Sequence, residues 1–218
     1  MSYVLGQINA AHREINSYPV SSGEGRSLLI RRTYDACIED VWDACTRPSR
    51  IGRWLAPVRG DFRVGGAFEV EGNASGRVLR CERPRLLKVT WDYGLDAATE
   101  VEVRLSPAPG GSTVFELRHA SPSELVDELV RTEGLAGAVR NGAGWDLVLL
   151  GLDVFLHDDD LDRAAWRDTP QVREFTIHSY RAWGDASRAA WGVSADDMAT
   201  VVESAVRHVT CALEGGDR

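Results

Sequence analysis

The side chains that most often perform catalysis or hold metals are sparse in this sequence. The histidines are His12, His119, His157, His178 and His208, and none has the HxxxH or HExxH spacing that presents two imidazoles on one helical face. The cysteines, Cys37, Cys45, Cys81 and Cys211, lack CxxC spacing, which argues against a zinc site and a disulfide framework. No GxSxG motif is present either. We therefore expect no metal, no cofactor and no catalytic residue set.

Glutamates in the middle of the chain could supply general acid–base chemistry, which needs carboxyl groups in one enclosed site. Glu69, Glu71 and Glu116 alternate with apolar residues over segments that have the two-residue period of a β-strand. This alternation places them on the face that meets solvent, so a catalytic carboxylate pair is not supported. His119 ends such a segment, where we expect a surface or hydrogen-bonded residue and not a general base.

Large apolar side chains are the remaining candidates for a functional site. They are Trp54, Phe68, Trp91, Phe115, Trp145 and Leu149. Each of them alone is more simply explained as a core residue, because large side chains bury much apolar area. As a group, between a sheet and a helix that do not close completely, they would line a cavity for an apolar ligand. We predict these residues as the ligand-binding set.

A central helix is the element that would position Trp145 and Leu149. Residues 142–156 read GAGWDLVLLGLDVFL, and one helical face carries Trp145, Val148, Leu149, Leu152 and Phe155. A second apolar stripe consists of Leu147, Leu150 and Val154, so this helix must be covered from two sides. The run is too short to span a bilayer, which takes about 20 apolar residues.

The segments before this helix predict an antiparallel sheet. The two-residue period is present in residues 28–34, 67–71, 77–82, 86–93, 99–105 and 113–119. Two short helices, 38–47 and 48–55, follow the first of these segments. The sheet has one apolar face to bury, and the central helix comes next in the chain. We therefore predict an α+β fold in which a curved antiparallel sheet grips one long helix.

The connection between sheet and helix has two parts. Residues 123–131 predict a short helix capped by Ser123. Residues 134–144 are rich in glycine and predict a connector that turns sharply or, alternatively, a mobile flap beside Trp54 at the mouth of a cavity.

Two amphipathic helices are expected in the tail. Thr169 with Pro170 and Ser194 with Asp197 have the residue types that begin helices. The apolar faces of these helices need a partner, which is either the second stripe of the central helix or another subunit. We divide the chain into an N-terminal segment 1–27, a sheet-and-helix domain 28–157 and a helical extension 158–218.

Composition narrows the classes of function. Of the 218 residues, 44% are hydrophobic and 27% are charged, which is ordinary for a globular protein. The net charge of −8 argues against a nucleic-acid binder and against adhesion to anionic lipid. The N-terminal residues lack the pattern of a secretory signal. We therefore expect a cytoplasmic protein without nucleic-acid or membrane partners.

Four segments, taken in order, resemble the START-like, or SRPBCC, superfamily. They are RRTYDACIEDVWDACTRPSRIGRWLAPVRGDFRVGGAF, GNASGRVLRCERPRLLKVTWDYG, GSTVFELRHA and GWDLVLLGL, all between residues 28 and 156. Within the superfamily they are similar to the branch named after the activator of the heat-shock-protein ATPase. The resemblance implies a helix-grip fold, in agreement with the fold expected from the residues. The tail resembles an extension of a subset of bacterial members.

The superfamily includes carriers of hydrophobic ligands, aromatase/cyclases and cochaperone modules, and it has no common catalytic residues to transfer. Our first hypothesis is a non-enzymatic binding protein for a small hydrophobic molecule held between the sheet and the long helix. The second is a protein-interaction or cochaperone-like regulatory module that acts through the sheet face or the tail. The third is a cyclase- or hydrolase-type enzyme that uses polar groups of the cavity. Separately from these hypotheses, a homodimer is one way to cover the tail helices.

Overall fold

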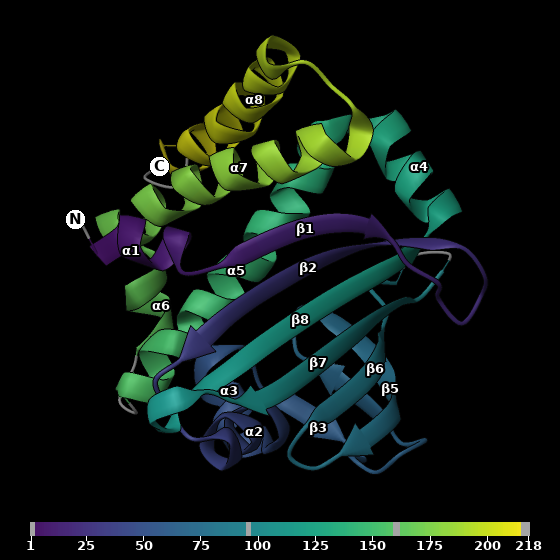
Figure 1. Ribbon diagram of the computed structural model, residues 1–218, viewed down its shortest axis with the longest axis vertical. Coiled ribbons are helices and arrows are strands. Elements are labelled where there is room, and N and C mark those ends of the chain that lie inside the picture. The colour runs from purple at the N-terminus through teal and green to yellow at the C-terminus, as the bar shows by residue number, and fades with distance from the viewer. Residues whose placement is uncertain (1–2, 95–96, 159–161, 215–218) are drawn as a thin grey trace.

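One antiparallel sheet and the helix that it wraps organise the protein (Figure 1). The computed structural model describes residues 3–94, 97–158 and 162–214. The strands are β1 (His12–Ser17), β2 (Gly25–Tyr34), β3 (Val58–Gly60), β4 (Ala67–Val70), β5 (Ala74–Glu82), β6 (Leu86–Trp91), β7 (Thr99–Pro107) and β8 (Thr113–Pro122). They pair in the order β1-β2-β8-β7-β6-β5-β4-β3. The helices are α1 (Tyr3–Asn9), α2 (Ile38–Thr46), α3 (Pro48–Trp54), α4 (Ser123–Glu133), α5 (Leu135–His157), α6 (Arg163–Arg167), α7 (Pro170–Trp191) and α8 (Ala195–Glu214).

The alternation of apolar and polar residues sets the two faces of each strand. In β8, Phe115 and Leu117 are buried, whereas Glu116 between them is only half-buried. β2 and β8 pair along their whole length, from Gly25 opposite Pro122 to Tyr34 opposite Thr113. The predicted antiparallel sheet is therefore confirmed.

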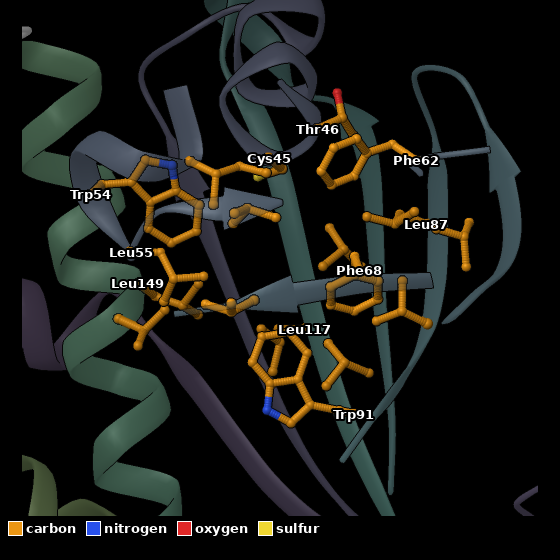
Figure 2. A pocket seen from close by; sticks show the side chains of 18 of the residues that line it. Cys45, Thr46, Trp54, Leu55, Phe62, Phe68, Leu87, Trp91, Leu117 and Leu149 are labelled. Carbon is orange, nitrogen blue, oxygen red and sulfur yellow. The ribbon is translucent and has the colours of Figure 1, made fainter. Parts of the chain in front are cut away.

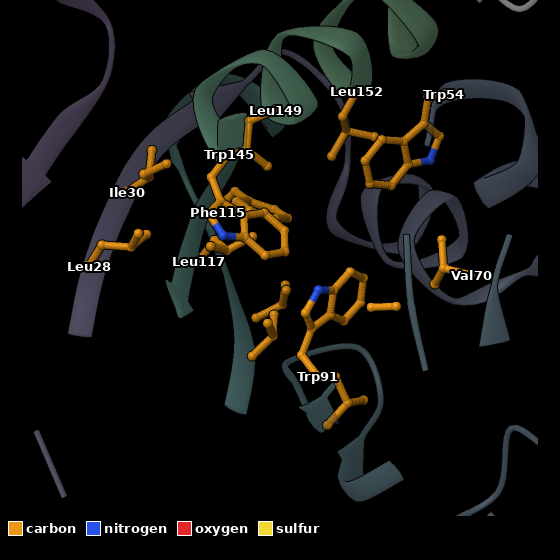
Figure 3. Close-up of a cluster of buried hydrophobic side chains, with 14 of the residues drawn as sticks. Leu28, Ile30, Trp54, Val70, Trp91, Phe115, Leu117, Trp145, Leu149 and Leu152 are labelled. Atoms are coloured by element: carbon orange, nitrogen blue, oxygen red, sulfur yellow. The ribbon is translucent and has the colours of Figure 1, made fainter. Parts of the chain in front are cut away.

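Helix α5 crosses the concave face of the sheet. Figure 3 shows Trp145 and Leu149 of this helix above Phe115 and Leu117 of β8, and all of them belong to one buried cluster. Helices α2 and α3 close one end of the grip, where Nε1 of Trp54 donates a hydrogen bond to the carbonyl oxygen of Ala44 at 3.0 Å. The helix-grip architecture expected from the sequence is thus confirmed.

The glycine-rich residues 134–144 form neither a connector nor a flap, so both interpretations were wrong. Gly134, with φ of 64°, ends the preceding turn, and the helix α5 begins at Leu135. Gly142 lies under the indole of Trp183, where a Cβ would come within 2.3 Å of Cδ2. Glycine serves here to let two helices approach closely, which the sequence does not distinguish from a turn.

The termini of the other helices test the predicted caps. Thr169 caps α7 by accepting a hydrogen bond from the backbone N–H of Val172, and Ser194 accepts one from the N–H of Asp197. Helix α4 also forms where expected, but it lacks a side-chain cap, so the predicted role of Ser123 was wrong.

The side of α5 that faces away from the sheet is covered by α7 and α8, and α1 packs against α7 (Figure 1). Leu150 packs there with Val4, Ile8 and Phe175. Helix α1 and the edge strand β1 were not expected, since β1 carries a single large apolar residue, Ile15. The tail helices therefore contact the second side of α5, while the division of the chain at residues 27 and 157 stays a prediction.

Candidate functional site

A first cavity of about 140 Å³ lies between α5 and the concave face of the sheet, at the end closed by α2 and α3 (Figure 2). Its lining includes all the residues predicted as ligand-binding: Trp54, Phe68, Trp91, Phe115, Trp145 and Leu149. Figure 2 shows Trp54 and Leu149 on one side and Phe68 on the other. The structure brings the predicted residues together, and their binding of a ligand stays a prediction.

The polar groups around the first cavity are largely engaged within the protein. Besides the bond of Trp54, the hydroxyl of Thr46 donates to the carbonyl oxygen of Trp42 at 2.7 Å. Nε1 of Trp91 is the exception, because it is buried without a hydrogen-bond partner among the described residues. A molecule in this cavity would meet apolar surface on nearly every side.

A thiol is the titratable group most deeply placed in the first cavity. Cys45 lies at the end of α2, and burial raises the pKa of its thiol to about 12, because the low-dielectric surroundings disfavour the thiolate. Arg50 opposes this shift only in part. Cys45 therefore contributes a protonated, poorly nucleophilic thiol to the lining of the first cavity.

Aromatic rings form a wall at the other end of the first cavity. The ring centroids of Trp91 and Trp145 are 5.5 Å apart, and those of Trp145 and His119 are 5.4 Å apart in an edge-to-face arrangement. Tyr93 continues the series, 6.2 Å from His119. These four residues, which we term the aromatic wall, join β6 and β8 to the gripped helix.

His119 occupies the centre of the aromatic wall with both ring nitrogens engaged. Nδ1 accepts a hydrogen bond from Nε1 of Trp145 at 3.0 Å, so Nε2 carries the proton and donates to the hydroxyl of Thr99 at 2.8 Å. Burial lowers the pKa of His119 to about 4. Of the two positions expected for His119, the surface position was wrong and the hydrogen-bonded position was right. A neutral imidazole with both nitrogens hydrogen-bonded is poorly suited to act as a base.

A second cavity of about 230 Å³ lies beyond the aromatic wall. Its lining is more polar than that of the first and includes Arg26, Thr99, His119 and Asn141. We expected residues 134–144 at the mouth of the first cavity, but the lining of that cavity contains none of them. Their side chains at Ala138 and Asn141 reach the second cavity instead.

Several lining residues of the first cavity were missed by the sequence analysis. Val148 lies on the apolar helical face that was recognised, so its position was available from the spacing. Phe62 is 38% exposed and sits in the turn between β3 and β4, where no periodicity marks it. The described part of the chain contains no cluster of three or more metal-ligating side chains. Within the same residues, no helix is long and apolar enough to cross a bilayer.

Comparison with known protein families identifies the family to which this fold and its cavity belong. The profile described as "Activator of Hsp90 ATPase homolog 1-like protein" matches residues 35–157, from the residue that follows β2 to the end of α5. The chain belongs to this family. The match of the Hsp90-activator-like family includes the first cavity but leaves α1, β1, β2 and the tail helices outside it.

Solved structures share the fold of this family member. CalU16 from Micromonospora echinospora is 37% identical in its crystal structure, with a TM-score of 0.64 over 81% of this chain and 98% of that one. The solution structure of CalU16 is 36% identical, with a TM-score of 0.66 over 83% and 96%. EF2215 from Enterococcus faecalis, a conserved protein of unknown function, is 13% identical with a TM-score of 0.58, a likeness that shows the fold alone. No curated protein matches the chain.

Proposed function

We propose that the protein binds a small apolar molecule in the first cavity. The observation that carries this proposal is the lining, in which aromatic and aliphatic side chains surround a space whose polar neighbours are mostly bonded elsewhere. Filling such a space with an apolar ligand removes hydrocarbon surface from water without stranding polar groups. An alternative as a cyclase or hydrolase has less support, because the described lining of this cavity includes neither a carboxylate nor an imidazole.

The size of the first cavity limits the ligand. An apolar cavity of roughly 150 Å³ accommodates benzene, so a cavity of about 140 Å³ encloses about one ring. A longer ligand would extend past Phe62, which lines the cavity and is partly exposed. Free thiols at Cys37, Cys45 and Cys81 fit a reducing compartment, so we place this binding in the cytoplasm.

The test is a titration with benzene, toluene and naphthalene, followed by thermal unfolding and by intrinsic tryptophan fluorescence. Trp54, Trp91 and Trp145 line the cavity, so a bound ring changes their emission, and binding raises the unfolding midpoint by mass action. The Val89→Phe variant places a ring inside the cavity and should abolish both responses. Val64→Phe is the matched control, since Val64 is 60% exposed and lines neither cavity. Unchanged responses in Val89→Phe would contradict the proposed site.

A second candidate is a protein-interaction role like that named in the family description. Phe62, Val64 and Leu79 are large apolar side chains that are exposed, and the backbone N–H of Gly65 bonds to the carbonyl oxygen of Val78, which ties their two segments together. Such exposed apolar groups are common at protein contacts. Addition of the protein to a bacterial Hsp90 should raise its ATPase rate if this role holds, and Val64→Asp should remove the increase.

A further inference from the structure

The second cavity is built from parts of the chain that are far apart in sequence. Arg26 and Leu28 come from β2, Leu125 and Leu129 from α4, and Trp191 from the end of α7. Figure 1 shows α4 beside that end of α7, beyond the ends of β1 and β2. Arg26 and Trp191 lie outside the residues that the family profile matches, so this cavity is not a property of the matched region alone.

The charged side chain in the described lining of the second cavity is positive, and it belongs to Arg26. Arg26 is half-buried, and its Cζ lies 4.9 Å from the ring centroid of Trp191. Among the described residues Arg26 has no ion-pair partner, and the described lining of the cavity contains no aspartate or glutamate. In a chain with net charge −8, an arginine that faces a cavity with only an aromatic ring against it favours an anion there.

Uncommitted hydrogen-bonding groups accompany this cation. The side-chain amide of Asn141 and the hydroxyl of Ser121 line the cavity and form no hydrogen bond with another described residue. By contrast, the hydroxyl of Thr99 is already shared between His119 and the carbonyl oxygen of Trp91. The cavity therefore offers an amide and a hydroxyl to a ligand, in addition to the charge.

The apolar side of the second cavity is supplied by a helix with little burial of its own. Helix α4 has an apolar face with Leu125, Val126 and Leu129, yet none of its residues is fully buried. Leu28 lies opposite on β2. A helix normally gains stability by burying its apolar face against the core. Here that face covers an open space, which a ligand with an apolar part would fill.

We propose that the second cavity is a separate binding site for a small amphipathic carboxylate. The carboxylate lies beside Arg26 and Asn141, and the apolar part of the ligand lies against Leu28 and the inner face of α4. A cation finds no counter-charge in this lining, and a wholly apolar molecule would desolvate the free polar groups without replacing their bonds to water. The volume of about 230 Å³ leaves room for a ring with a short chain. This site does not depend on what occupies the first cavity.

The experiment compares 3-phenylpropionate with 3-phenylpropanol, which has the same ring and chain without the charge. The full-length protein is titrated with each, and the indole N–H resonance of Trp191, assigned by its loss in Trp191→Phe, is followed by NMR. We expect the acid to shift this resonance and to bind at least tenfold more tightly than the alcohol, because a charge-assisted bond is worth more than a neutral one.

Variants separate the parts of the site. Arg26→Gln should weaken binding of the acid about tenfold, to the level of the alcohol. Arg31→Gln is the matched control, since Arg31 is on the same strand, is exposed and lines neither cavity. Ala138→Leu fills the cavity and should weaken both ligands. Equal affinity for acid and alcohol, no shift of Trp191 at millimolar acid, or shifts confined to Trp54, Trp91 and Trp145 would each overturn the proposal.

Discussion

Nε1 of Trp145 donates a hydrogen bond to Nδ1 of His119 across 3.0 Å, joining the gripped helix to the last strand of the sheet. Both residues are buried, so the bond is made where water does not compete for either partner. It also separates an apolar cavity, lined by Trp145, from a more polar one, lined by His119. One hydrogen-bonded pair thus gives a single helix-grip interior two compartments of different chemistry.

The free energy of unfolding should decrease as the pH is lowered, because His119 titrates differently in the folded and unfolded states. The pKa of this residue is about 4 in the folded protein, against an ordinary value of 6.5. Between these values the unfolded chain binds the proton and the folded protein does not, so the free energy of unfolding decreases as the pH falls from 6.5 toward 4, by up to about 3 kcal/mol. Above pH 6.5 this contribution is constant.

Urea unfolding of the native protein and of His119→Asn at several pH values isolates this effect. The asparagine side chain still offers an acceptor toward Trp145 but does not titrate, so the difference in unfolding free energy between the two proteins should shrink on acidification. Carboxyl groups contribute equally to both proteins and cancel. A difference that stays constant between pH 7 and 4 would show that His119 is not held neutral.

Two glycines of α5 should respond oppositely to the same substitution. In Gly142→Ala the new Cβ would lie 2.3 Å from Cδ2 of Trp183, and such overpacking typically costs about 1–3 kcal/mol. At Gly144 a Cβ meets no atom within 4 Å, so Gly144→Ala should gain the helix propensity of alanine, up to about 1 kcal/mol. Thermal unfolding of the two variants checks both signs, and stabilisation by Gly142→Ala would contradict the close approach of α7.

The alternation of residues predicted the strands and the helical spacing predicted the gripped helix, because both periods reflect which side chains must be buried. Gly142 misled the prediction, since only the position of Trp183, some 40 residues later in the chain, shows that a small residue is needed there. β1 was missed for a related reason. Its place at the sheet edge depends on backbone pairing with β2, and Ile15 alone gives no pattern.

The lining of the first cavity was accessible from the sequence, since large aromatic residues on inward-facing positions converge when a sheet curves around a helix. The second cavity was not, because it requires Arg26, Asn141 and Trp191 to meet from three elements whose relative placement no local pattern specifies. The role of His119 was not predictable for the same reason. The residue spacing around it indicates a strand, but its burial and its acceptance of a hydrogen bond depend on Trp145, which is distant in the sequence.

Thiol reactivity should distinguish Cys45 from Cys37. Burial raises the pKa of Cys45 to about 12, whereas Cys37 is exposed. At pH 8 a thiol with that pKa holds roughly 1000-fold less thiolate than an ordinary one near 9, and the thiolate is the reactive form. Alkylation with iodoacetamide, mapped by mass spectrometry, should therefore modify Cys37 long before Cys45. Equal rates would mean that the first cavity is open to water at Cys45.

Asp146 should be the residue on which the attachment of the tail depends. Its Oδ2 accepts hydrogen bonds from Nε of Arg13 at 2.8 Å, from Oγ of Ser179 at 2.5 Å and from Nε1 of Trp183 at 3.0 Å. One carboxylate on α5 therefore joins β1 to α7. Asp146→Ala would leave Arg13 buried and unpaired, at a cost of about 3–5 kcal/mol. Glu128→Ala, which removes an exposed partner of Arg131, is the control and should cost about 1 kcal/mol or less.

Removal of residues 158–218 tests the same attachment from the other side. It takes away two of the donors to Asp146 and uncovers Leu150, which packs on Phe175, together with the half-buried Leu147 and Val154. A buried carboxylate and an apolar stripe would then meet water together, so we expect the shortened chain to aggregate or to lose any dimer in size-exclusion chromatography. The full chain with Asp146→Ala should show a weaker form of the same behaviour, because α7 keeps its apolar contacts but loses its polar anchor. A shortened chain that stays monomeric, with a native circular dichroism spectrum and unchanged thermal unfolding, would show that the grip is stable without its outer helices.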